Sequence, residues 1–245
     1  MDDGLGTGRA AGAKGAVRHR LPALMIVLTV ATGLVEAVSF LALGPVFTAM
    51  QTGNVLFLGF GAARMGGLPA LPAAVSLAAF SVGAVCGARL ESASEGRGWR
   101  WFVIGLFVEA GLILVAAGVG WGLAPRYGAP TARHMWVTAV LALAMGMRNA
   151  TILRANVPGV PTTLVTRSMT AFLGGSAMGR GNAFRFGTPG WVLRGLSVPA
   201  MFAGGLFGAL MVRAGWSVGW LLLPVSVIVL VAGAAQLGQP RLSTG

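Results

Sequence analysis

Charged residues are scarce in this chain, and acidic residues are the scarcest. Only 10% of its 245 residues are charged and six are acidic, whereas about 25% of the residues in a typical soluble domain are charged. A water-soluble globule with so few charges lacks the polar side chains that would cover its surface. The composition therefore excludes an ordinary soluble domain and favours a surface that faces lipid.

Cysteine and histidine are nearly absent. Cys86 is the single cysteine, so a disulfide within the chain is impossible. The two histidines, His19 and His134, lie at the edges of apolar runs, and no C-x-x-C, H-E-x-x-H or EF-hand spacing occurs. Neither histidine has an apparent nucleophile and carboxylate around it, and no P-loop or Rossmann fingerprint is found. We therefore expect no metal site, no cofactor and no enzymatic activity.

Positive charge is the one charge in excess. The net charge of +12 by itself suggests a nucleic-acid partner. However, the basic residues lie mostly between apolar runs, where the positive-inside rule of membrane proteins places them. They form no stripe interleaved with exposed aromatic residues. We therefore expect the bilayer of the bacterial inner membrane, and no nucleic acid, as the partner of this surface.

Long apolar runs dominate what is present. Hydrophobic residues make up 56% of the chain, and the mean hydropathy is +0.79. A run of about 20 apolar residues spans the hydrocarbon core as a helix. Six runs approach this length: Leu21–Leu43, Pro72–Leu90, Trp101–Leu123, Met135–Leu153, Gly195–Val212 and Val218–Leu237. The pattern predicts an all-α integral membrane protein.

Two shorter and more polar runs, Val46–Ala63 and Pro161–Ala177, interrupt this series. We expect them to be broken or re-entrant helices, which leaves six crossings; if both short runs cross, there are eight. The expected organisation is a disordered basic tail, a first transmembrane repeat, a second repeat and a C-terminal tail, over residues 1–20, 21–123, 124–237 and 238–245.

Landmarks recur in the same order in the two halves. They are Gly33–Ala37 with Gly146–Ala150, Phe47–Asn54 with Pro161–Ser168, Gly83-x-x-x-Gly87 with Gly204-x-x-x-Gly208, and Trp101 with Trp220. An internal duplication explains this order, and halves with three crossings each are inverted relative to one another. The Gly-x-x-x-Gly faces predict close helix packing and also offer a surface for a homo-oligomer.

Arginine and lysine arbitrate between six and eight crossings. With a cytoplasmic N-terminus and Arg148 inside the membrane, six crossings place thirteen basic residues inside and four outside. With eight crossings Arg167 also lies in the membrane, and the counts become eleven inside and five outside. Four residues then move outside and three move inside: Arg89, Arg97, Arg100 and Arg154, and Arg64, Arg126 and Arg133. The positive-inside rule therefore favours six crossings by a narrow margin.

Glu36 is the sharpest functional signal. It lies about 18 Å along the helix axis from Leu24, well inside the first predicted crossing. An ionised carboxylate in hydrocarbon costs several kcal/mol, so it needs a partner, a cavity or a proton. Two interpretations stand equally: a proton, cation or solute site, and a structural ion pair with Arg148 or Arg167.

The segment Gln51-Thr52-Gly53-Asn54 is the second signal. It follows Gly44-Pro45, which should break the helix. Polar side chains at a helix break inside the membrane are typical of solute sites in transporters. The alternative is hydrogen bonding between helices. We favour the solute site, because polar groups cluster at the break in both halves.

The second half carries its own candidate residues. Arg148 and Asn149 raise the same question as Glu36, and Thr162, Thr166 and Arg167 correspond to the first polar cluster. Glu109, in the third predicted crossing, is expected to be a pairing partner rather than a site residue.

The motifs resemble those of the YoaK-type family of bacterial membrane proteins of unknown function. The resemblance rests on Gly33–Gly44 and on Thr52-Gly53-Asn54 with its context, and extends over about residues 21–237. This chain has Glu36 where the family pattern leads us to expect Asp, and Thr166-Arg-Ser where Thr-Gly-Thr is expected. The resemblance supports the architecture and implies no substrate.

Two functions follow from these observations. The first is a small-solute transporter with Glu36 as the binding or coupling carboxylate, and with the remaining candidates lining the site. The second is a structural or regulatory membrane component whose polar residues only hold helices together. A membrane enzyme acting on lipid ranks last, because a catalytic set is missing from the sequence.

Overall fold

The computed structural model describes residues 5–64, 70–127, 129–155, 165–176, 179 and 190–241, with side chains from residue 21 onward. Within these ranges all regular structure is helical, and no strand occurs. The expected tail of residues 1–20 overlaps the first helix, which begins at Leu5; the disorder of that tail stays a prediction.

Six helices are long and apolar enough to cross a membrane. They are α1 (Leu5–Ala42, apolar from Leu21), α3 (Ala70–Gly96), α4 (Trp101–Val119), α5 (Ala132–Ala155), α7 (Trp191–Arg213) and α8 (Val218–Ala235). Their apolar parts contain 18 to 27 residues, which at 1.5 Å per residue reach about 27–40 Å. This confirms the predicted all-α membrane fold and its six long segments.

Two helices are too short to cross. The helices α2 (Gln51–Ala62) and α6 (Val165–Gly174) contain 12 and 10 residues, which span only about 18 and 15 Å. They coincide with the two short polar runs. The prediction that each half has three long helices and one short helix therefore agrees with the described helices.

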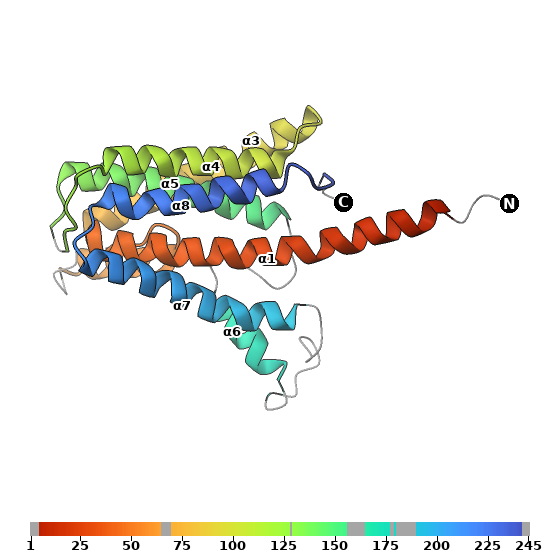
Figure 1. Cartoon of the computed structure of the whole chain (residues 1–245). Helices are drawn as coiled ribbons and strands as arrows, with labels where there is room; N and C mark the ends of the chain where they lie inside the picture. The colour runs from red at the N-terminus through yellow and green to blue at the C-terminus, as the bar shows by residue number, and fades with distance from the viewer. Residues whose placement is uncertain are drawn as a thin grey trace.

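The long helices run side by side, and both chain termini lie at the same end of the bundle (Figure 1). We call this the terminal end and the other the distal end. At the terminal end the Arg100 guanidinium donates hydrogen bonds to the Gln236 and Gln239 carbonyls, which joins the start of α4 to the end of α8. At the distal end the Arg126 N–H donates to the Ala42 carbonyl. An even number of crossings, whether six or eight, places the two termini on one side of the membrane, in keeping with this arrangement.

Glycine allows the closest helix contacts. A Cβ on Gly33 of α1 would meet the Met201 carbonyl of α7, and one on Gly204 of α7 would meet the Val30 carbonyl of α1. The same relation joins α3 and α5, where Gly83 lies against Leu143 and Gly146 against Phe80. The Gly-x-x-x-Gly faces are thus occupied within one chain, as small residues at helix interfaces permit. The expected homo-oligomer stays a prediction and requires another surface.

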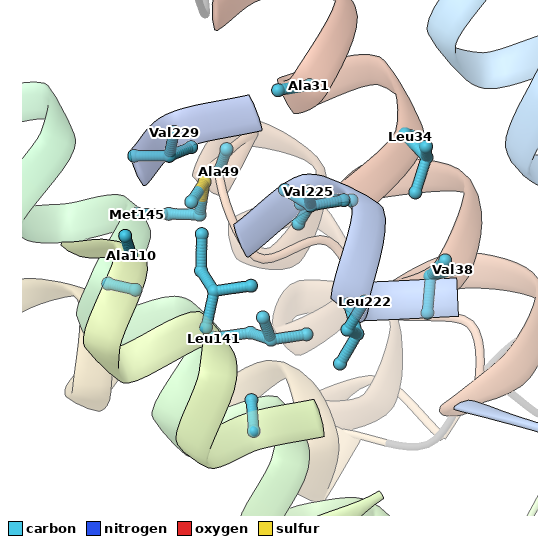
Figure 2. Close-up of a cluster of buried hydrophobic side chains, with 14 of the residues drawn as sticks. Ala31, Leu34, Val38, Ala49, Ala110, Leu141, Met145, Leu222, Val225 and Val229 are labelled. Carbon is cyan, nitrogen blue, oxygen red and sulfur yellow. The ribbon is translucent and has the colours of Figure 1, made fainter. Parts of the chain in front are cut away.

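Apolar side chains from α1, α4, α5 and α8 form the core. Figure 2 shows Leu222, Val225 and Val229 of α8 among side chains of the neighbouring helices. Ala49 belongs to this cluster although it lies in the non-helical segment between α1 and α2. The chain therefore turns back into the core after α1, and α2 begins inside the bundle.

The number of crossings is testable by cysteine labelling. In a Cys86→Ser background, we expect Gly96→Cys and Leu237→Cys to react with a membrane-impermeant thiol reagent from the same side, and Tyr127→Cys from the opposite side. Gly96 is the last residue of α3, Leu237 follows the end of α8, and Tyr127 lies between α4 and α5. The side chains of Leu237 and Tyr127 are exposed. Eight crossings instead place Gly96 opposite Leu237 and Tyr127 beside it, which would contradict the six-crossing arrangement.

Candidate functional site

A turn that re-enters the core carries the first polar cluster. The helix α1 ends at Ala42, and Gly44 follows with a φ of 103°, a conformation that glycine adopts without steric cost. Val46, Thr48 and Ala49 are buried before α2 begins at Gln51. These residues have non-helical backbone at membrane depth, which is tolerated only where protein groups satisfy the exposed N–H and C=O groups.

Glu36 satisfies the donors of this turn. Its side chain is 5% exposed. Its Oε1 accepts hydrogen bonds from the Thr48 N–H (3.2 Å), the Thr48 hydroxyl (3.3 Å) and the Ala49 N–H. Ala49 lies two residues before the start of α2, so the carboxylate is close to the positive end of that helix, where a negative charge is stabilised.

One of the two interpretations of Glu36, an ion pair with Arg148 or Arg167, is not found among the described residues. The first carboxylate oxygen accepts hydrogen bonds from backbone and hydroxyl groups. The second, Oε2, accepts none from the described residues. Arg148 has other partners, and Arg167 is exposed on α6.

Asn54 fastens the same turn from the other side. The fully buried Asn54 accepts a hydrogen bond from the Phe47 N–H (3.0 Å) and donates to the Phe47 carbonyl (2.6 Å). The Ser76 hydroxyl of α3 donates to the same carbonyl (2.6 Å). Gln51 accepts from Asn54 (2.7 Å) and donates to the Thr48 carbonyl (2.9 Å). The amide groups of Gln51 and Asn54 are thus used within the protein to hold the turn against α2 and α3.

Thr52 and Gly53 play different parts. Thr52 is exposed and lies away from this network. Gly53 lies against the Phe47 ring, which would be 2.7 Å from a Cβ at that position. The same ring stacks on Phe40 and Phe57, with centroids 5.1 and 5.9 Å away. Gly53 therefore makes room for an aromatic side chain that anchors the turn.

A buried ion pair forms the second polar cluster. Arg148 of α5 pairs with Glu109 of α4, and each residue is 1% exposed. The Arg148 guanidinium also donates to the Thr32 hydroxyl (2.8 Å) and to the Leu28 carbonyl (3.2 Å) of α1. The expectation that Glu109 is a pairing partner is confirmed, and the pair joins α1, α4 and α5.

The two clusters are neighbours along α1. Thr32, which binds Arg148, precedes Glu36 by one helical turn, about 6 Å along the axis. Glu36 Oε2, Glu109 Oε2 and Arg148 Nε have no hydrogen-bond partner among the described residues. Because a buried polar atom without a partner costs free energy, these atoms are the ones positioned to bind a proton, a water molecule or a ligand.

The candidates of the second half are not gathered in the same way. Asn149 donates to the Met145 carbonyl of its own helix (2.9 Å). Thr166 and Arg167 are exposed on α6, and Thr162 lies outside the described residues.

A cluster at the terminal end escaped the sequence analysis. The Thr151 hydroxyl of α5 donates to buried Glu91 of α3, and Arg154 pairs with Glu95 one turn further along. The Arg154 guanidinium also lies 5.3 Å from the Trp101 ring centroid. Glu91 and Glu95 are four residues apart and therefore lie on one helix face, a spacing that could have indicated this cluster. They were missed because they follow the predicted apolar run and do not interrupt it.

Comparisons with known proteins agree on one family. A family model described as "Protein of unknown function (DUF1275)" matches residues 24–235. A protein named UPF0700 transmembrane protein YoaK, from Bacillus subtilis (strain 168), is 24% identical over 151 residues. That match covers 61% of this chain and 64% of the relative, so the chain spans less than two thirds of the relative's length. No solved structure matches.

The Arg148–Glu109 pair should behave as a coupled unit. We expect Glu109→Leu and Arg148→Met each to lower the free energy of unfolding by about 3–5 kcal/mol, because each leaves a buried charge without its partner. The double variant should recover most of this loss. Denaturant or thermal unfolding in detergent measures it, with Glu95→Gln in the half-exposed Arg154 pair as the control, expected to cost at most about 1 kcal/mol. Additive losses in the double variant would show that the pair is not coupled.

Asn54 should be needed for the turn and Thr52 should not. Asn54→Asp keeps the shape of the side chain but removes the donor to the Phe47 carbonyl, and we expect a loss of about 1–3 kcal/mol for the unpaired buried groups. Thr52→Ala, at an exposed neighbouring position, should change stability by no more than about 0.5 kcal/mol. Equal stabilities of the two variants in the same unfolding assay would refute the role of Asn54.

Proposed function

We propose that this chain, which belongs to the DUF1275 family of proteins of unknown function, is a small-solute transporter of the cell membrane. The solute or coupling ion binds at the turn before α2, with Glu36 as the binding or coupling carboxylate. Gln51 and Asn54 hold the turn in position. Asn149, Thr162, Thr166 and Arg167 are proposed for the corresponding region of the second half.

The short helix α2 is the observation that carries this proposal. It begins inside the bundle, beside a buried carboxylate, and its 12 residues do not reach across. Discontinuous helices of this kind form the solute and ion sites of many secondary transporters, because their ends present unpaired backbone groups at membrane depth. A protein that only needs a stable bundle has no need of such a helix end.

The packing of the long helices supports the proposal further. The helix α1 packs on α7 and α3 packs on α5, while α4 packs on α8. In the proposed duplication α1 corresponds to α5, α3 to α7 and α4 to α8. Exchanging each helix with its counterpart turns the α1–α7 pair into the α5–α3 pair and leaves the α4–α8 pair unchanged, as expected for the inverted repeats of transporters. The four close glycine contacts follow the same exchange, since Gly33 corresponds to Gly146 and Gly83 to Gly204.

Arginine placement supports a cytoplasmic terminal end in the inner membrane. The distal end carries Arg64, Arg126, Arg133 and Arg213. The terminal end, including the short helix α6, carries a larger set: Arg89, Arg97, Arg100, Arg154, Arg167, Arg194 and Arg241. An excess of arginine on one side marks the cytoplasmic face.

One observation favours the alternative, a structural or regulatory membrane component without a transport cycle. The polar groups of Gln51 and Asn54 bind other parts of the protein. In that case Glu36 would serve only to hold the turn. We further propose that the chain is not an enzyme, in line with the lack of a catalytic set in its sequence.

A ligand screen separates these two functions. Purified protein in detergent is heated with panels of metabolites and ions, with wild type beside Glu36→Gln. A ligand at about 100 times its dissociation constant stabilises the folded state by about 2.7 kcal/mol, which corresponds to a shift of several degrees. We expect at least one compound to shift wild type, and Glu36→Gln to change the size or the pH dependence of that shift.

The matched control is Glu95→Gln, which makes the same acid-to-amide change at the terminal end. It should respond to the compound as wild type does. Should no compound shift wild type while Glu36→Gln is merely less stable, the structural alternative holds and the transporter proposal is wrong.

A further inference from the structure

We infer that the transported solute is a small carboxylate anion that exchanges places with the Glu36 carboxylate at the turn before α2 and enters together with one proton. The inference rests on the proposed transport function and specifies its substrate class and its coupling.

The turn already functions as a carboxylate-binding site within the protein. Two successive backbone N–H groups, of Thr48 and Ala49, and the Thr48 hydroxyl converge on one carboxylate oxygen. Successive N–H groups near the positive end of a helix are a favourable site for anions. The occupant is the side chain of Glu36, which belongs to another helix and is tethered only through α1.

The second oxygen of Glu36 supplies an independent observation. The side chain is 95% removed from solvent, being 5% exposed, and its Oε2 has no hydrogen-bond partner among the residues that the structure describes. Oε2 is the atom on which a proton can settle without breaking an existing contact.

The charges around Glu36 do not balance it. The nearest buried cation, Arg148, is neutralised by Glu109. The helices α2 and α8 contain no titratable residue. The other titratable residues from α4 to α5 and on α7 lie between these helices or toward helix ends: Arg126, Tyr127, Arg133, His134, Arg154, Arg194 and Arg213. Among the described residues, backbone and hydroxyl dipoles are therefore the direct counter-charge of an ionised Glu36.

These facts link proton and anion. When a proton binds Oε2, the Glu36 side chain becomes neutral and its hold on the Thr48 and Ala49 N–H groups weakens. Buried N–H groups without an acceptor cost several kcal/mol in lipid, so another acceptor must take them. An incoming carboxylate does so and restores the single negative charge that the turn holds in the resting protein. One proton and one monovalent anion enter together, and the net charge of the bundle is unchanged.

A carboxylate is favoured over other anions because the site is already shaped for one. A dianion such as phosphate would bring a second charge for which the neighbouring elements offer no cation. A cation would be repelled by the positive end of α2, which lies close to the site.

The test measures acetate binding to the full-length protein by thermal unfolding in detergent, from about pH 6 to about pH 8, where acetate stays ionised. Chloride replaces acetate at constant ionic strength in the reference samples. Because binding takes up a proton, the acetate affinity of wild type should fall tenfold for each unit of rising pH wherever Glu36 is ionised. Glu36→Ala, which lacks the internal carboxylate, should bind acetate with an affinity that does not change with pH, and acetate should restore part of the stability lost by the substitution.

Two further variants keep the result interpretable. Glu36→Gln should also bind without pH dependence, and it serves where Glu36→Ala does not fold. Glu95→Gln should keep the pH dependence of wild type. Acetate binding that ignores pH in wild type would overturn the coupling. Failure of acetate where another compound of the ligand screen shifts wild type would overturn the substrate class alone. Failure of every compound would overturn the transport proposal with it.

Discussion

The arrangement of α1, α2 and α3 depends on one constraint: backbone polar groups inside a membrane must find partners in the protein. The turn between α1 and α2 places non-helical backbone among apolar side chains such as Ala49. Glu36 takes donors of this turn, and Asn54 takes both the N–H and the carbonyl of Phe47. Without these partners, the backbone groups of the turn would be unsatisfied in the core, and α2 could not begin there.

Hydropathy sufficed to predict the long helices and failed to predict which residues meet. A membrane helix is apolar on nearly all sides, so its sequence indicates depth but only weakly indicates which face meets which neighbour. The depth of Glu36 could therefore be predicted, but the choice between a site and an ion pair with Arg148 or Arg167 could not, because the rotation that brings Arg148 to Glu109 depends on how α4 and α5 pack. Composition likewise identified Gln51 and Asn54 as polar groups at a helix break. It did not reveal that Phe47 and Ser76 use those groups.

Glu36 and Glu109, two buried carboxylates within long apolar helices, differ in what balances their charge. Glu109 faces a guanidinium that is itself bonded to α1, so the charge of the pair is balanced and three helices are joined. Removing either charge leaves the other stranded, which resists any change of state. Glu36 faces neutral donors, so a proton can come and go without leaving an opposite charge unpaired. A residue that must change its charge during a cycle needs surroundings of the second kind.

The correspondence between the two halves sharpens this distinction. In the proposed duplication, Gly33–Ala37 corresponds to Gly146–Ala150, which sets Glu36 opposite Asn149 and Val35 opposite Arg148. A duplicated bundle would present two turns to its solute from opposite ends. Among the described residues, the turn of the first half faces the Glu36 carboxylate, whereas Asn149 carries no ionisable group. If both halves take part in transport, they do so unequally: one end of the pathway responds to protons and the other does not. The proposed stoichiometry of one proton per anion then follows from the difference between Glu36 and Asn149.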